Sequence, residues 1–141
     1  MKKRLALAAT LLLLITGFTA CKKENESTKP LRSKIIGKWQ VNKIEITTFS
    51  ASGAAETTST TYTSSDYLDF KDNESDDFEL ALTTRTVIGS FSTAIGNKLF
   101  LDFTDRDLDC NVTTITDNQL QFVGTVTGAN PKITETYFLS R

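Results

Sequence analysis

A tight turn followed by an alternating strand decides the fold expected for this chain. The stretch reads Gly96-Asn97-Lys98-Leu99-Phe100-Leu101-Asp102-Phe103. Its first two residues form a dipeptide typical of short hairpin turns. In the rest, Leu99, Leu101 and Phe103 recur at every second position, which is the period of a half-buried strand. The stretch therefore predicts a β-hairpin, with the preceding strand over residues 86–95.

The same period of two extends outward in both directions along the chain. Phe78, Leu80 and Leu82 alternate with more polar residues, and so do Leu108, Cys110 and Val112. We expect about eight strands, over residues 38–46, 57–71, 78–82, 86–95, 98–103, 108–114, a segment containing Leu120 and Phe122, and 133–140.

Two of these strands need a further interpretation. In the first, Trp39 and Val41 have the opposite parity to Ile44 and Ile46. A bulge near Asn42-Lys43 would restore a common inner face. Residues 50–56 are small and polar and are expected to form a loop. Residues 57–65 are nearly all Thr and Ser, and because Thr favours strands we interpret 57–71 as one continuous strand.

Short turns join almost all of these segments, and short turns imply antiparallel neighbours. One helical turn over residues 31–36 precedes the first strand, and Gly37 would end it. A meander of about eight strands leaves two exposed edges unless it closes on itself. We therefore predict an all-β fold, an antiparallel up-and-down barrel. A two-sheet sandwich fits less well, because its crossings need longer connections.

The first 30 residues indicate export and a lipid anchor. Three basic residues and an apolar run too short to span a membrane are followed by Phe18-Thr19-Ala20-Cys21. This stretch resembles the lipobox of bacterial lipoproteins, although Phe18 stands where the family usually has Leu. The resemblance implies a signal peptide over residues 1–20 and acylation of Cys21. Residues 21–30 lack apolar character after the cysteine and are expected to be a disordered tether, which leaves 31–141 as the barrel domain.

The two ends of the predicted barrel carry a second resemblance. Gly37-Lys38-Trp39 opens the first strand, and Arg141 follows the last. The pair resembles the ends of a lipocalin-type barrel, in which a Gly-x-Trp motif packs against an arginine. The resemblance implies that Trp39 and Arg141 close the barrel. Short lipocalin-like lipoproteins of the Bacteroides group (Bacteroidota) are similar over residues 67–70, 97–99 and 110–120.

Composition excludes several classes of chemistry. The chain has no histidine, so catalytic sites built on Ser-His-Asp or Cys-His are impossible. Cys110 lies in an alternating strand and is interpreted as a buried thiol. Residues 72–77 carry acids in the pattern of a calcium loop but lack its glycine, so we expect a solvated turn. We predict no catalytic residues, no metal and no cofactor.

Charge argues against nucleic acid as a partner. Without residues 1–20 the chain keeps 13 basic and 17 acidic groups, a net charge of −4. A modestly acidic chain without a basic patch is poorly suited to phosphate backbones. We expect a monomer, anchored to the outer membrane of the cell envelope by lipid, either periplasmic or surface-exposed.

Two hypotheses for function remain open. In the first, the barrel is a non-enzymatic module that binds a small apolar ligand in its interior. In the second, the interior is completely filled, and the barrel is a structural or interaction domain that binds an envelope protein or glycan on its outer face. The predicted ligand-binding residues of the first hypothesis are Leu68, Phe70, Phe78, Leu80, Phe91, Leu101, Phe103 and Phe122.

Overall fold

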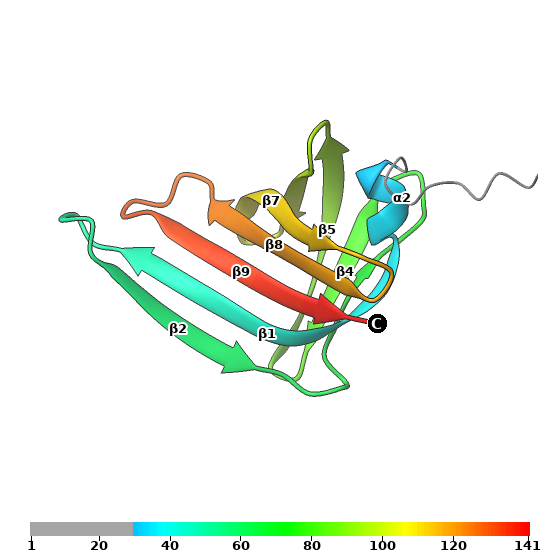
Figure 1. Ribbon diagram of the computed structural model, residues 1–141, viewed down its shortest axis with the longest axis horizontal. Coiled ribbons are helices and arrows are strands. Elements are labelled where there is room, and N and C mark those ends of the chain that lie inside the picture. Colours follow the sequence, from blue (N-terminus) through cyan, green and yellow to red (C-terminus); the bar gives the residue numbers. More distant parts are fainter. Residues whose placement is uncertain (1–29) are drawn as a thin grey trace, which may run out of the picture.

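A 13-residue first strand organises the molecule (Figure 1). The computed structural model describes residues 30–141. The predicted signal peptide, Cys21 and the predicted tether as far as residue 29 lie outside the described residues. Within these residues, one short helix, α2 (Leu31–Ile35), precedes nine strands. The strands are β1 (Gly37–Phe49), β2 (Ala55–Thr61), β3 (Tyr67–Phe70), β4 (Asp77–Leu82), β5 (Arg85–Ala94), β6 (Lys98–Phe103), β7 (Asp107–Ile115), β8 (Gln119–Val126) and β9 (Ile133–Ser140).

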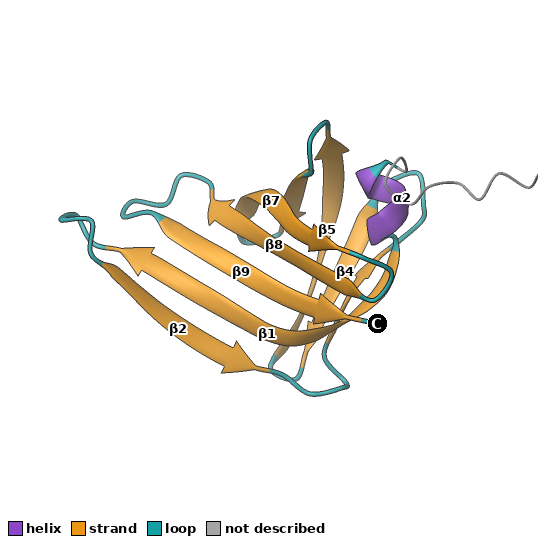
Figure 2. Cartoon of the chain, in the orientation of Figure 1, coloured by secondary structure: helices purple, strands orange, loops and turns teal. Residues whose placement is uncertain are grey.

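The strands form one antiparallel sheet that closes into a barrel. From β3 to β9 each strand pairs with its neighbour in sequence, and β9 pairs back onto β1. The other side of β1 is shared, because its first residues pair with β3 and its later residues pair with β2. Eight strands therefore make the closed barrel, and β2 is an additional strand beside it. The predicted all-β antiparallel barrel is confirmed (Figure 2).

The register of β1 contains the predicted bulge. Pairing with β9 shifts by one residue between Val41 and Lys43. The shift lets Trp39, Val41 and Ile44 all face the core, where they are 0–6% exposed. The bulge therefore corrects the change of parity seen in the sequence.

The predicted continuous strand over residues 57–71 is wrong. The structure divides it into β2 and β3, with residues 62–66 between them. Asp66 is buried there, and its carboxylate accepts hydrogen bonds from the backbone N–H and hydroxyl groups of Thr63 and Thr83. The bonds from Thr63, followed by those from Thr83, lower the pKa of Asp66 to about 2. The bonds from Thr63 are of the local kind that competes with a strand ladder. Together with the long-range bonds from Thr83, they explain the break.

The predicted loop over residues 50–56 is also too long. β2 begins at Ala55, and the turn is closed by backbone hydrogen bonds between Ser50 and Ala54 and between Gly53 and Ser50. The hairpin extends to the outer left of Figure 1, away from α2. All seven residues of β2 are exposed, so this strand adds pairing to β1 but no side chain to the core.

Candidate functional site

The interior of the barrel holds all eight predicted ligand-binding residues. They come from β3, β4, β5, β6 and β8, and each alternates inward with a residue that faces out. Five are 0% exposed and the others no more than 4%, so no space the size of a water molecule lies beside most of them. Their rings contact one another directly, with 5.1 Å between the ring centres of Phe70 and Phe91 and 4.8 Å between those of Phe78 and Phe103. The five fully buried residues are Leu68, Phe70, Phe78, Leu80 and Phe122.

Two glycines show how closely this interior is packed. A methyl group on Gly89 would lie 2.6 Å from the ring of Phe78, and one on Gly124 would lie 2.9 Å from the sulfur of Cys110. Both separations are well below ordinary van der Waals contact. The inward residues therefore fill the space that they enclose. Ligand binding by them stays a prediction, and it would require the core to open.

A buried ion pair lies at the end of the barrel opposite α2. Arg106, in the turn between β6 and β7, donates to both carboxylate oxygens of Glu135 on β9, at 2.7 and 2.9 Å. Tyr137 donates its hydroxyl to Glu135 at 2.8 Å, and the guanidinium lies 4.4 Å from the ring centre of Phe103. The pair thus connects the β6–β7 turn to the last strand over the end of the core opposite α2.

The electrostatics of this cluster follow from burial and pairing. Burial is the largest single influence and acts to lower the pKa of Arg106, but the hydrogen bonds to Glu135 and the electrostatic attraction of neighbouring groups together outweigh it and raise the pKa. Burial is the largest cause that raises the pKa of the Tyr137 hydroxyl well above its ordinary value, and the charge of Glu135 adds to it. Arg106 is therefore charged and Tyr137 neutral at physiological pH, and both stabilise the carboxylate.

The sequence interpretation missed this pair. Arg106 lies in a short turn, yet its side chain is only 15% exposed. A signal was present in β9, where Glu135 has the same parity as the inward residues Tyr137 and Leu139. A charge on an inward face needs a partner, but the sequence does not say which turn supplies it.

Neutralising Glu135 tests the ion pair. Glu135→Gln should cost about 1–3 kcal/mol of unfolding free energy, because Arg106 keeps its charge in a mostly buried position without a full partner. Urea denaturation of the two proteins measures the difference. Asp105→Asn is the matched control: Asp105 also pairs with Arg106, but its side chain is 50% exposed, so the loss should be below about 1 kcal/mol. Equal losses in both variants would contradict a special role for Glu135.

Trp39 and Arg141 meet at the α2 end of the barrel. The guanidinium carbon of Arg141 lies 3.8 Å from the centre of the Trp39 ring. The indole N–H donates to the carbonyl oxygen of Ile35 at 2.7 Å. Arg141 also donates to the carbonyl oxygens of Ile36, Lys34 and Asp117, at 3.0, 3.3 and 2.8 Å. One arginine therefore joins the helix, the first strand and the β7–β8 turn.

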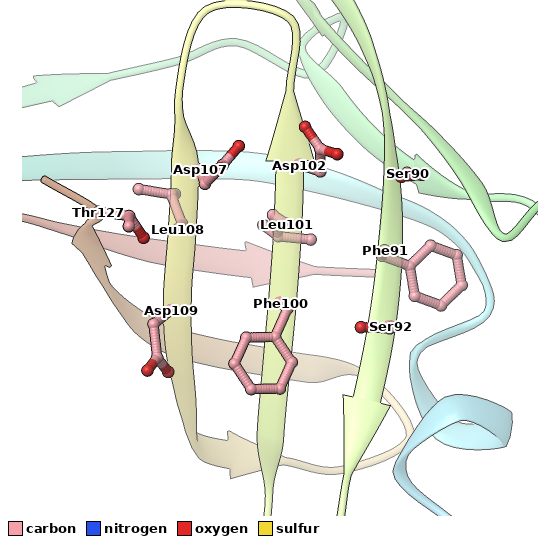
Figure 3. A pocket seen from close by; sticks show the side chains of 10 residues that line it. All are labelled: Ser90, Phe91, Ser92, Phe100, Leu101, Asp102, Asp107, Leu108, Asp109 and Thr127. Carbon is pink, nitrogen blue, oxygen red and sulfur yellow. The ribbon is translucent and has the colours of Figure 1, made fainter.

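The outer face of β5, β6 and β7 carries a shallow hollow of about 430 Å³ (Figure 3). Two rows of outward side chains cross it. In one row Phe100 lies between Ser92 and Asp109, and in the other Asp102 lies opposite Asp107. Phe100 is 40% exposed. Its outward-facing lining residues are Ser90, Ser92, Phe100, Asp102, Asp107, Asp109 and Thr127, and between them lie Phe91, Leu101 and Leu108, whose side chains are buried in the core.

Electrostatics make this hollow unusual for the outside of a barrel. Asp102 and Asp107 are directly opposite on neighbouring strands, an arrangement in which like charges repel. The ion pairs of residues 30–141 include Lys98 with Asp109, at 3.0 Å, but none that neutralises Asp102 or Asp107. The hollow thus presents two uncompensated carboxylates in one row of side chains and an exposed aromatic ring in the next. Its chemistry suits a ligand rich in hydrogen-bond donors.

The other candidate reactive groups among residues 30–141 are either buried or paired with other side chains. Cys110 is fully buried, and burial raises the pKa of its thiol to about 12. Arg32 donates to Asp72 and Asp76, in the turn that resembles a calcium loop. Residues 30–141 contain no cluster of three or more metal-ligating side chains. No helix in that range is long and apolar enough to cross a membrane.

Comparison with models of protein families, with curated proteins and with solved structures finds no match for this chain. The fold and the site geometry must therefore carry any functional conclusion.

Proposed function

We propose that this chain is an envelope lipoprotein whose barrel is a non-enzymatic interaction domain, with a basic segment of an envelope protein as its partner. The observation that carries the proposal is the hollow on β5, β6 and β7, combined with a filled interior. A filled interior leaves the outer surface for binding. There, Asp102 and Asp107 attract one cationic side chain, and the exposed ring of Phe100, in the neighbouring row, offers a second one a cation–π contact.

The proposed anchor and the proposed site fit each other. Acylated Cys21 would hold the barrel at the outer membrane, where its partners are other envelope components. A lysine or arginine side chain inserted between the two carboxylates would remove their mutual repulsion as well as gaining two attractive interactions. Because the site is open to solvent, these interactions are screened by salt, and the contact would be specific but weak.

Binding of basic and neutral probes to residues 30–141 tests the proposal. An Arg-rich peptide should bind, and affinity should fall as salt is raised, since the attraction is electrostatic. Phe100→Ala should weaken binding about 3- to 30-fold, the equivalent of the roughly 0.5–2 kcal/mol of a cation–π contact. Titration calorimetry with the peptide and with neutral oligosaccharides measures both effects.

Two control variants make the result specific to the hollow. Ile88→Ala removes another exposed apolar side chain, 61% exposed, outside the hollow. Asp117→Asn removes one negative charge from the distant β7–β8 turn. Both should bind the peptide as the unaltered domain does, whereas Asp102→Asn should not. Binding of a neutral oligosaccharide that is insensitive to salt would contradict the basic partner and favour a glycan.

A small apolar ligand in the interior is the second candidate. The apolar lining of the core favours it, because such a lining selects ligands without polar groups. The ligand would have to displace packed side chains and the Arg106–Glu135 pair. A fatty acid held only by the native barrel would raise its melting temperature, so a panel of lipids that leaves this temperature unchanged argues against the carrier.

A further inference from the structure

β2 leaves one complete strand edge without a partner in residues 30–141. It lies at the end of the strand order and pairs only with β1. Figure 1 shows it along the outer rim of the molecule. Exposed edges attract other strands, and proteins usually block them with lysine, proline or a bulge. β2 reads Ala-Glu-Thr-Thr-Ser-Thr-Thr, with none of these devices and with a regular register to β1.

The pairing with β1 identifies the main-chain groups on the free edge. Tyr62 donates its N–H to the carbonyl of Asn42, and the same register pairs Thr60 with Ile44 and Thr58 with Ile46. In an antiparallel pair, residues alternate between those bonded to the partner and those whose N–H and C=O point away. The even-numbered residues of β2 therefore bond β1. Thr57, Ser59 and Thr61 direct both main-chain groups outward.

We infer that β2 pairs with β2 of a second copy of this chain, antiparallel and about a two-fold axis at Ser59. In this register Ser59 lies opposite its own counterpart and Thr57 lies opposite Thr61 of the other copy. All three pairs are of the hydrogen-bonded kind, so every outward group of these residues is satisfied. The two sheets then continue into one another through the strand edges.

Side chains and charges also fit this register. Thr58 would lie opposite Thr60 of the other copy on one face, and Thr57 opposite Thr61 on the other face. Hydroxyl pairs of this kind stabilise neighbouring strands, and one exists within the chain, where Thr47 and Thr57 share a hydrogen bond of 2.8 Å. Glu56 is the one charged residue of β2. Its counterpart lies at the far end of the pair, so like charges do not meet.

A single pair of strand edges buries little surface, and its affinity in dilute solution is low. Confinement raises the local concentration of a weakly binding partner. The proposed lipid anchor would supply that confinement. The stability of the dimer in membranes therefore rests on the proposed function. The register itself depends only on the geometry of β1 and β2.

Cysteine crosslinking of the full chain in its membrane tests the inference. Residues opposite each other in a hydrogen-bonded pair have Cα atoms about 5.5 Å apart, which a disulfide can bridge. Ser59→Cys should form a covalent dimer about tenfold or more faster than Ser52→Cys, an exposed position in the β1–β2 turn that reports random collision. Thr57→Cys alone should crosslink slowly, but quickly with a coexpressed Thr61→Cys chain.

Each alternative gives a different result. Equal rates for Ser59→Cys and Ser52→Cys overturn the pairing. Fast dimer formation by the Thr57→Cys chain alone overturns the antiparallel register. A mixed disulfide with another envelope protein overturns the inference that the partner of β2 is a second copy of this chain. The unaltered chain should not crosslink, since Cys110 is buried. A dimer of the unaltered chain reports a free thiol at Cys21, which contradicts the lipid anchor and leaves the β2 pairing standing.

A proline variant separates main-chain pairing from recognition of hydroxyl groups. Ser59→Pro removes an outward N–H without removing a bond to β1, and edge strands tolerate proline at such a position. When Ser59→Pro is introduced into both the Thr57→Cys chain and the Thr61→Cys chain, crosslinking between them should fall about tenfold. Ser59→Ala, which keeps the N–H, should leave it unchanged. If both Ser59→Pro and Ser59→Ala reduce crosslinking, pairing through the main chain is overturned. It is also overturned if neither variant reduces crosslinking.

Discussion

Replacement of Trp39 by alanine is expected to cost about 3–5 kcal/mol of unfolding free energy, as for other large buried aromatic residues. The indole is 0% exposed, so its removal leaves a cavity that the closely packed barrel cannot fill. It also breaks the hydrogen bond to Ile35 and the stacking with Arg141. Urea denaturation of residues 30–141 measures the loss. Phe100→Ala is the matched control, because Phe100 is an exposed aromatic residue of the outer face and should cost far less.

A double-mutant cycle tests whether Trp39 and Arg141 act together. Arg141→Ala alone should destabilise through lost stacking and through three lost bonds to backbone carbonyl groups. The two substitutions should show a coupling free energy of about 0.5–2 kcal/mol, the range of cation–π contacts. Strict additivity would contradict a joint role in closing this end of the barrel.

Substitution of Cys21 is expected to have the largest effect on where the protein is found. Each buried methylene of an acyl chain contributes about 0.8 kcal/mol, so two or more chains hold a protein on a membrane almost permanently. Cys21→Ser removes the acceptor thiol and should abolish membrane association while the barrel remains folded. Fractionation of cells after high-salt and carbonate washing measures it.

The second cysteine provides the control for that experiment. Cys110→Ala changes the core, where Cys110 is 0% exposed, but leaves the acceptor at residue 21 intact. This variant should stay with the membranes. A Cys21→Ser chain that also stays with them would contradict the lipoprotein interpretation.

Alternation along the chain was sufficient to predict most of the fold. Phe78, Leu80 and Leu82 face inward as their period of two requires, and the Gly96-Asn97 turn has the positive φ angles typical of hairpins, 80° and 64°. Antiparallel pairing followed from the shortness of the turns. The bulge after Val41 could also be predicted, because apolar residues changed parity there. Each of these features depends on neighbours in the sequence.

Sequence composition alone misplaced the Thr-rich segment. Its strand propensity is real, since residues 55–61 form β2, but the continuous strand fails at Asp66. The carboxylate of Asp66 finds two of its four donors on Thr83, in the turn between β4 and β5. A bond across 17 residues leaves no pattern in the local sequence.

The sequence by itself determined the class of fold and the inward set of side chains, because both depend on local periodicity. The contact of Trp39 with Arg141 at the α2 end of the barrel was implied by a family resemblance and not by periodicity. Only the tertiary structure decided that the inward side chains fill the barrel, since packing depends on the volume that eight strands enclose together. It also brought Arg106 to Glu135, Asp102 opposite Asp107, and β2 to an unpaired edge. These contacts depend on which strands are neighbours and in what register, and no single stretch of the chain encodes that relation.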